Sequence, residues 1–308
     1  MSKRLKSCLV MICLVVLLTG SMSFYTLADQ NTADDIGEPI FTEAVDEATD
    51  AAIVFECVEI PLIVDGNHIG QGYLVNGVTY VPMRAFCEAM LKTEFDAEWN
   101  QEDESVYLCT EGLEISMTLA DRYLEANGRY LYLGDGAYNI NGTIIAPIRE
   151  LARIFCLDVE WDHSEWSIEI DTSDISIIEH GDIYYANFDL YWLSRVINAE
   201  SGGEPLEGRI GVGNVVLNRV ADQSGYWKDT IKGVIFQPGQ FAVVESTGVY
   251  LQPNEGSVVA AKICLEGYKT VGESKFFFNP KNSGSSWLKD IGTFYISIAN
   301  HDFYTFNY

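Results

Sequence analysis

Positively charged residues are scarce in this chain of 308 residues, which has 19 Lys and Arg against 45 Asp and Glu. The resulting net charge of −26 repels nucleic acid and anionic lipid, so neither is an expected partner. A neutral polymer remains an allowed partner. Solubility in a salty exterior explains the same charge, so charge alone does not separate the two interpretations.

Histidine and cysteine are also few, which bears on metal binding. The four histidines are scattered without an HExxH motif, and no two cysteines have CxxC spacing, so we expect no metal ion and no cofactor. Five cysteines follow the N-terminal apolar segment, an odd number that leaves at least one thiol free. We expect them to be small buried hydrophobes, and their pairing stays open. They are Cys57, Cys87, Cys109, Cys156 and Cys264.

A long apolar run stands at the N-terminus, CLVMICLVVLL, after a basic trio and before small and polar residues that end at Ala28. This layout predicts a secretory signal peptide cleaved after Ala28, because the run is too short for a membrane span of about 20 residues. An uncleaved N-terminal anchor is the alternative. Cleavage would change the net charge from −26 to −29, since residues 1–28 carry three positive charges and no negative ones. Residues 29–55 are acidic without an apolar period, which predicts a solvated linker.

A repeat with an offset of 65 residues runs through the middle of the chain. VNGVTYVPMRAFCEAM (75–90) and INGTIIAPIRELARIF (140–155) share Asn-Gly, Pro and Arg, and the downstream FDAEW and LDVEW also match. Each unit predicts a strand, an Asn-Gly turn, a second strand, a helix opened by Pro-x-Arg and a further strand. Arg84 and Arg149 are expected to orient the helix or pair with a carboxylate, with a ligand role as the alternative.

These repeats resemble the copper amine oxidase N-terminal-like stalk domain over residues 56–172. The resemblance rests on NG-(x)4-P-x-R with a trailing Glu-Trp. Despite its name, that domain is not the copper-binding part of the oxidase. The resemblance implies a spacer or wall-targeting module and not a catalyst.

Downstream, INAESGGEPLEG (197–208) places three glutamates close together. Four apolar residues ahead of them recur at the spacing of an amphipathic helix, with Asp189 as its expected N-cap. They are Leu190, Leu193, Val196 and Ile197. Continuing that stripe puts Glu200 on the apolar face at the C-terminal end of the helix. Apolar surroundings and the negative end of the helix dipole both disfavour the carboxylate, so Glu200 is the expected general acid.

The other two glutamates have structural explanations. Glu204 precedes a proline, which predicts an extended backbone near the cap of the next helix, so it either supports the acid or lines the cleft. Glu207 then falls in the first turn of that helix, where a negative charge meets the dipole favourably.

LSRVINAESGGEPLEGRIGVGNVVLNRV (193–220) and three later segments, TIKGVIFQPGQF, FFFNP and IANHDFY, resemble the SleB-type cell-wall hydrolases, the spore cortex-lytic enzyme family. The resemblance covers residues 189–308, with a departure at Ala299, where the family usually has glycine. It implies a lysozyme-like, lytic transglycosylase-like α+β domain that cleaves peptidoglycan between N-acetylmuramic acid and N-acetylglucosamine. The Glu200-Ser201 pair also resembles that of the soluble lytic transglycosylases.

Further residues are candidates for binding substrate. They are Ser201, Glu204, Gln240, Phe241, Asn279 and His301. For most of them the alternative is a structural role, in the core, in a turn or, for His301, as a hydrogen-bonded buried histidine. A water-using glycosidase ordinarily needs two carboxylates, whereas a lytic transglycosylase needs one. Possible second acids, which the sequence does not place in a cleft, are Asp229, Glu245 and Glu255.

The sequence therefore predicts an α+β protein with a signal peptide (1–28), an acidic linker (29–55), a β-hairpin and helix repeat domain (56–172), a linker (173–188) and a catalytic domain (189–308). The expected function is an exported, wall-associated enzyme that cuts peptidoglycan with Glu200, without metal. The alternatives are a water-using muramidase and a non-catalytic wall-glycan-binding protein. The oligomeric state stays open.

Overall fold

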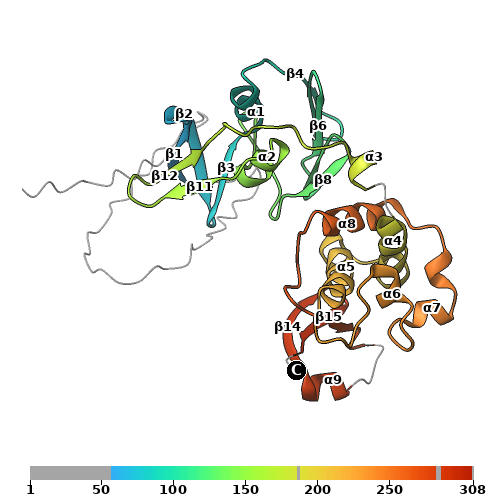
Figure 1. Ribbon diagram of the computed structural model, residues 1–308. Helices are drawn as coiled ribbons and strands as arrows, with labels where there is room; N and C mark the ends of the chain where they lie inside the picture. Colours follow the sequence, from blue (N-terminus) through green and yellow to red (C-terminus); the bar gives the residue numbers. More distant parts are fainter. Residues whose placement is uncertain (1–56, 186–187, 282–285, 307–308) are drawn as a thin grey trace, which may run out of the picture.

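The computed structural model describes residues 57–185, 188–281 and 286–306 (Figure 1). The expected signal peptide and acidic linker lie outside these residues. We call residues 57–185 the N-terminal half and residues 188–306 the C-terminal half, because each contains its own large cluster of buried hydrophobic side chains. Strands dominate the first half and helices the second, which confirms a mixed α+β protein.

A seven-stranded sheet forms one layer of the N-terminal half. The pairing of β1 with β12 is parallel and the other pairings are antiparallel. In spatial order the strands are β11 (Glu160–Asp162), β12 (Ser167–Ile170), β1 (Val58–Val64), β2 (Asn67–Val75), β3 (Val78–Pro82), β10 (Thr143–Pro147) and β9 (Tyr138–Ile140).

Both repeat units fold as the sequence predicts. The first runs through β2, a turn, β3, helix α1 (Met83–Leu91) and β4 (Asp96–Asn100), and the second through β9, a turn, β10, helix α2 (Ile148–Ile154) and β11. Asn76 and Asn141 open the two turns with φ of 50° and 52°, and the glycine after each also has positive φ. Such backbone angles are what a tight hairpin turn demands, which explains why Asn-Gly recurs at this place.

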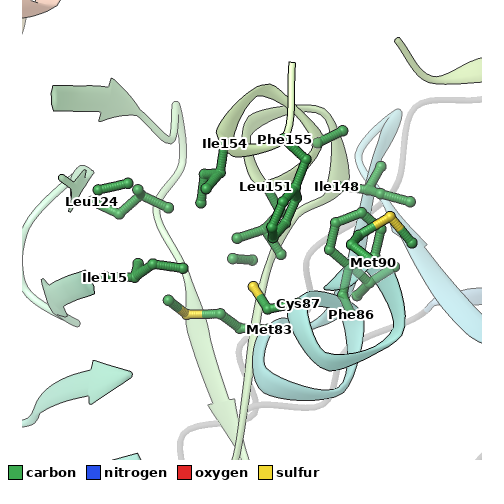
Figure 2. Close-up of a cluster of buried hydrophobic side chains, with 14 of the residues drawn as sticks. Met83, Phe86, Cys87, Met90, Ile115, Leu124, Ile148, Leu151, Ile154 and Phe155 are labelled. Carbon is green, nitrogen blue, oxygen red and sulfur yellow. The ribbon is translucent and has the colours of Figure 1, made fainter. Parts of the chain in front are cut away.

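A second, five-stranded sheet covers the helices of the repeat. Its strands in order are β4, β5 (Ser105–Thr110), β6 (Leu113–Thr118), β7 (Tyr123–Ala126) and β8 (Arg129–Tyr132). Figure 1 shows α1 and α2 between the two sheets. Figure 2 shows Met83 of α1 next to Ile115 of the second sheet, and Phe86 and Met90 of α1 next to Ile148 of α2. One core therefore joins both repeat units.

The segment that the sequence assigns to a linker contains a short helix, α3 (Gly181–Tyr184). The His180 side chain accepts a hydrogen bond from the backbone N–H of Asp182, and Gly181 donates its N–H to Asn127 at 2.7 Å. A Cβ at Gly181 would stand 2.2 Å from the carbonyl oxygen of Gly128, so only glycine permits this contact. Part of the expected linker thus packs on the N-terminal half.

Helices surround α5 in the C-terminal half. Its helices are α4 (Phe188–Ser201), α5 (Leu206–Val220), α6 (Ile231–Ile235), α7 (Ala242–Glu245), the 3₁₀ helix η1 (Gly248–Tyr250), α8 (Glu255–Leu265) and α9 (Ser286–Ile291). Asp189 lies inside the first turn of α4, so its expected place as the N-cap is wrong by at least one residue. Helix α5 packs against α4, α6 and α8, and most of its residues are buried. No helix in the described ranges has the length and apolar content needed to cross a bilayer.

A small antiparallel sheet closes the C-terminal half, in the order β13 (Phe276–Phe278), β15 (His301–Thr305) and β14 (Thr293–Ile298). The turn between β14 and β15 begins at Ala299 with φ of 50°. Alanine adopts this left-handed conformation at a cost in free energy that glycine avoids, so Ala299 strains this turn.

The two halves meet through a buried ion pair. Glu266 follows α8, and its side chain has 0% exposure. Arg129 of β8 donates Nε and Nη2 to the Glu266 carboxylate at 2.7 and 2.6 Å, and the Tyr185 hydroxyl also donates to it. Arg153 donates to the Glu266 backbone carbonyl at 2.9 Å. Charged side chains are rarely buried unless paired, and here the pairing joins residues 137 positions apart.

Candidate active site

Glu200 lies one residue before the end of α4. Leu193, Val196 and Ile197 of the same stripe are fully buried, and Glu200 itself is half-buried. Burial raises the pKa of the Glu200 carboxyl above its ordinary value, and the positive charge of Arg219 acts against this rise. The side chain therefore combines a raised proton affinity with partial exposure to solvent, the two properties that a general acid requires.

Arg219 is the charged neighbour that the sequence analysis does not single out. It lies on α5 and is buried, and its Nε donates to the Lys275 carbonyl at 2.8 Å. Its guanidinium carbon stands 4.3 Å from the centre of the Trp227 ring and 5.0 Å from that of Phe241. Aromatic faces and a fixed hydrogen bond hold this cation in place, where its charge acts on Glu200.

A signal for Arg219 is present in the sequence. Val212, Val215, Val216 and Arg219 follow the helical spacing i, i+3, i+4, i+7, and the three valines are fully buried. A charge on an apolar stripe is the pattern that selects Glu200. Applied to α5, it selects Arg219 as well.

Phe241 and Gln240 lie in the segment that leads into α7. Phe241 is buried with its ring against Arg219, so it helps to build the wall of the site. Gln240 is half-buried in a turn and donates its backbone N–H to Gln237 at 3.2 Å. The structure brings Phe241 close to the charges of the site, and it gives Gln240 a turn position beside it.

Ser201 is buried, and its hydroxyl donates to the Ile197 carbonyl one turn earlier at 2.9 Å. Serine hydroxyls in helices commonly donate to the carbonyl four residues earlier. Ser201 therefore packs inside the helix end, and substrate contact through its hydroxyl would require this bond to break.

Glu204 ties α5 to the turn between β14 and β15. Its carboxylate accepts hydrogen bonds from the backbone N–H of Asn300 at 3.2 Å and from the Asn300 side chain at 3.0 Å. Burial acts to raise the pKa of Glu204, but the Asn300 bonds and the charges of His301 and Lys281 outweigh it, so the pKa is lowered. Glu204 is therefore a carboxylate at neutral pH and a poor general acid.

His301 is the first residue of β15, and Asn279 directly follows β13. Burial lowers the pKa of the His301 imidazole, although Glu204 and Asp302 act against this, and Nδ1 finds no hydrogen-bond partner in the part of the chain that the structure describes. The Phe277 ring stands edge-on, 5.3 Å away. Asn279 accepts a bond from the Lys281 backbone at 2.9 Å, which shapes the turn after β13.

The three possible second acids lie at the surface of the C-terminal half. Asp229, Glu245 and Glu255 are all exposed, and Glu255 acts electrostatically on Asp121 of the N-terminal half. Burial is the cause that raises the pKa of Glu200, and Arg219 is the charge that acts to lower it.

Two buried asparagines fix the segment behind the site. Asn214 donates to the Tyr268 carbonyl at 2.8 Å and accepts from the Thr270 backbone at 2.9 Å. Asn218 donates to the carbonyls of Gly272 and Ser274 at 2.8 and 2.9 Å. These bonds fix the segment that leads into β13, whose Phe276 ring centre stands 5.3 Å from the guanidinium carbon of Arg219.

Comparison with known families identifies both halves. The cell wall hydrolase family matches residues 203–304, and the copper amine oxidase N-terminal domain matches residues 63–170. The first match begins three residues after Glu200. Within the described residues, no three His, Cys, Asp or Glu side chains gather as a metal site would require, so the residues present do not provide for copper.

Curated relatives agree over the same region. A spore cortex-lytic enzyme of Bacillus cereus is 35% identical over 104 residues, which are 34% of this chain and 39% of the relative. The spore cortex-lytic enzyme of Bacillus subtilis is 33% identical over 34% of this chain and 33% of its own length. The chain thus spans about two fifths or less of the length of these relatives.

Two solved structures are similar as well. The catalytic domain of the germination-specific lytic transglycosylase SleB from Bacillus anthracis is 31% identical, with 42% of this chain and all of that chain covered and a TM-score of 0.37. The catalytic domain of the Bacillus cereus SleB protein is 32% identical, with 38% and 89% covered and a TM-score of 0.35. By its C-terminal half this chain belongs to the cell wall hydrolase family with a SleB-like catalytic domain, and a copper amine oxidase N-terminal domain precedes that half.

Proposed function

We propose that this chain is an exported enzyme that cuts the glycosidic bond between N-acetylmuramic acid and N-acetylglucosamine in peptidoglycan, as a lytic transglycosylase with Glu200 as its one acid. Membership of the cell wall hydrolase family supports peptidoglycan as the substrate and action outside the cytoplasm. The Bacillus anthracis relative, which is 31% identical, is a lytic transglycosylase, and this supports the reaction type. We also propose a lysozyme-like catalytic domain over residues 189–308 and a stalk over residues 56–172.

The observation that carries the proposal is the environment of Glu200. Its carboxyl is half-buried, burial raises its pKa, and Arg219 is the charge that acts on it. A protonated Glu200 donates its proton to the glycosidic oxygen as the bond from that oxygen to the anomeric carbon breaks. Positive charge then develops on the sugar while Glu200 becomes a carboxylate, which the fixed cation of Arg219 stabilises.

The second half of the reaction returns Glu200 to its starting state. The carboxylate accepts the proton of the muramyl 6-hydroxyl, and the oxygen of that hydroxyl bonds to the anomeric carbon. The product carries a 1,6-anhydro ring, no water is consumed, and Glu200 is protonated again. One carboxyl group serves both steps, so this reaction does not need a second acid.

The test is the substitution Glu200→Gln, which keeps the shape of the side chain and removes the transferable proton. Loss of general-acid help should lower the rate of peptidoglycan solubilisation at least about 100-fold. Glu245→Gln is the matched control, because Glu245 is an exposed carboxylate at the end of α7. It should retain full activity.

Two outcomes would contradict the proposal. A Glu200→Gln variant that clears a sacculus suspension at near the wild-type rate would show that Glu200 is not the acid. A Glu245→Gln variant as inactive as Glu200→Gln would show that two carboxylates work together, as in a water-using muramidase.

A further inference from the structure

The two repeat units of the N-terminal half are related by a local two-fold axis. Val81 of β3 pairs with Ala146 of β10, and these two residues occupy equivalent positions of the repeat, 65 residues apart. On either side, Pro82 pairs with Ile145 and Tyr80 pairs with Pro147. In the repeat, Pro82 corresponds to Pro147 and Tyr80 corresponds to Ile145, so the second pair is the first pair with the two units exchanged. Such an axis runs perpendicular to the sheet, so α1 and α2 lie on the same face, as Figure 2 shows.

The axis generates two equivalent grooves. The first, of about 730 Å³, is lined by Arg149, Glu160 and Trp161 of the second unit and by the hairpin turn at Gly77 of the first unit. The second, of about 620 Å³, is lined by the counterpart residues of the other unit. These are Arg84, Glu98, Trp99 and the hairpin turn at Gly142. Both volumes fall within the roughly 300–1,000 Å³ of small-ligand sites.

Residues that are identical in the two units gather at these grooves. Asn-Gly and Pro have a structural explanation in the turns and helix starts, and Arg149 donates to the Val159 carbonyl at 3.0 Å. The tryptophans differ in their surroundings. Trp99 is 38% exposed, and its Nε1 donates to the Gln101 side chain at 3.1 Å. Its repeat counterpart Trp161 is half-buried against the core, and Trp166, edge-on to it at 5.8 Å, is 62% exposed. Each groove therefore has one exposed indole face, which suits a ligand that stacks on aromatic rings.

The lining indicates the chemistry of that ligand. Glu88 and Glu98 lie in one groove and Glu150 and Glu160 in the other, within a chain of net charge −26. Acidic grooves repel anionic polymers. Flat indole faces suit the C–H face of a sugar ring, and carboxylate, amide and guanidinium groups suit its hydroxyl and N-acetyl edges. A neutral, N-acetylated glycan has both features.

We propose that the two grooves of the N-terminal half are equivalent binding sites for the glycan strands of the cell wall, so that this half attaches the enzyme at two points. Tyr268 of the C-terminal half forms part of the first groove, which places one attachment point next to the catalytic half. Two linked sites raise the overall affinity by about 10²–10⁴-fold over one site. The proposal does not require Glu200 to be catalytic.

The experiment measures binding by the full chain to a long, soluble chitin chain. This probe is a neutral N-acetylated glycan that has no stem peptides and no lactyl carboxylates, and it contains no bond to N-acetylmuramic acid that the proposed activity would cut. Trp99→Ala or Trp161→Ala alone should weaken binding roughly 100-fold by leaving one point of attachment. The double variant should weaken it further. Trp99→Phe, which keeps an aromatic face, should bind nearly as tightly as the parent.

The matched control is Ile69→Ala, since Ile69 is an exposed apolar residue of the same half outside both grooves. It should leave the dissociation constant unchanged. A folded Trp99→Ala/Trp161→Ala variant that binds like the parent would overturn the proposal, as would binding to intact peptidoglycan together with no binding to the chitin chain. Neither result bears on the Glu200→Gln rate assay, so failure of this proposal is distinguishable from failure of the proposed function.

Discussion

Removal of the cation that pairs with Glu266 should cost the protein a large part of its stability. Arg129→Met replaces the guanidinium with an apolar side chain of similar length. Glu266, whose side chain has 0% exposure, would lose two hydrogen bonds of 2.7 and 2.6 Å. Leaving one member of a buried ion pair alone costs about 3–5 kcal/mol. Arg153 remains 3.7 Å from the carboxylate, so we expect a loss near the lower end, about 3 kcal/mol.

The assay is urea unfolding followed by tryptophan fluorescence at neutral pH. Lys269→Met is the matched control, because the Lys269–Glu273 pair is exposed, at 43% and 73%, and surface pairs contribute roughly 0–1 kcal/mol. The double variant Arg129→Met/Glu266→Met should lose less than the sum of the two single losses, since it buries no unpaired charge. An Arg129→Met loss within about 1 kcal/mol of the Lys269→Met loss would refute the idea that this pair holds the two halves together.

Three further predictions concern the C-terminal half. Burial raises the pKa of Glu200 in the folded state, so the folded protein binds this proton more tightly than the unfolded chain and loses stability as pH rises above the unfolded pKa. Glu200→Gln should therefore gain in melting temperature relative to the parent between pH 4 and pH 7, and a constant difference would contradict the raised pKa. Ala299→Gly relieves a φ of 50° and should stabilise by roughly 0.5–1 kcal/mol in urea titration, whereas a loss would show that the turn is unstrained. A Cβ at Gly213 would stand 2.6 Å from the Cys264 sulfur, so Gly213→Ala should destabilise by about 1–3 kcal/mol, and adding Cys264→Ala should recover part of it unless the clash is elsewhere.

The repeat could be predicted from the sequence because its signals are local. Asn-Gly demands positive φ at one place, and Pro-x-Arg opens a helix just after a strand, so each unit carries the instructions for its own hairpin and helix. The pairing of Val81 with Ala146 does not follow from either unit alone. It depends on how the two units assemble, and the grooves depend on that assembly as well.

The half-buried position of Glu200 near the end of α4 could also be predicted, because it follows from helical spacing, while its role as the acid stays a prediction. The interface between the halves could not. Arg129 and Glu266 are 137 residues apart, and neither lies on a pattern that marks it as buried. The helix α3 was missed for a related reason, since its four residues are held by contacts with the distant turn at Asn127. Burial of the cysteines holds for Cys87 and Cys264, while Cys156 is exposed, against expectation.

The most direct test of the account is the fate of solvent oxygen during cleavage. Purified sacculi are digested by the enzyme in heavy-oxygen water, and the released fragments are weighed by mass spectrometry. A single-acid transglycosylase at Glu200 predicts fragments that end in 1,6-anhydromuramic acid, lighter by one water, resistant to borohydride and without heavy oxygen. Heavy oxygen at new reducing ends would show that water attacks the anomeric carbon, and it would contradict the one-carboxyl mechanism.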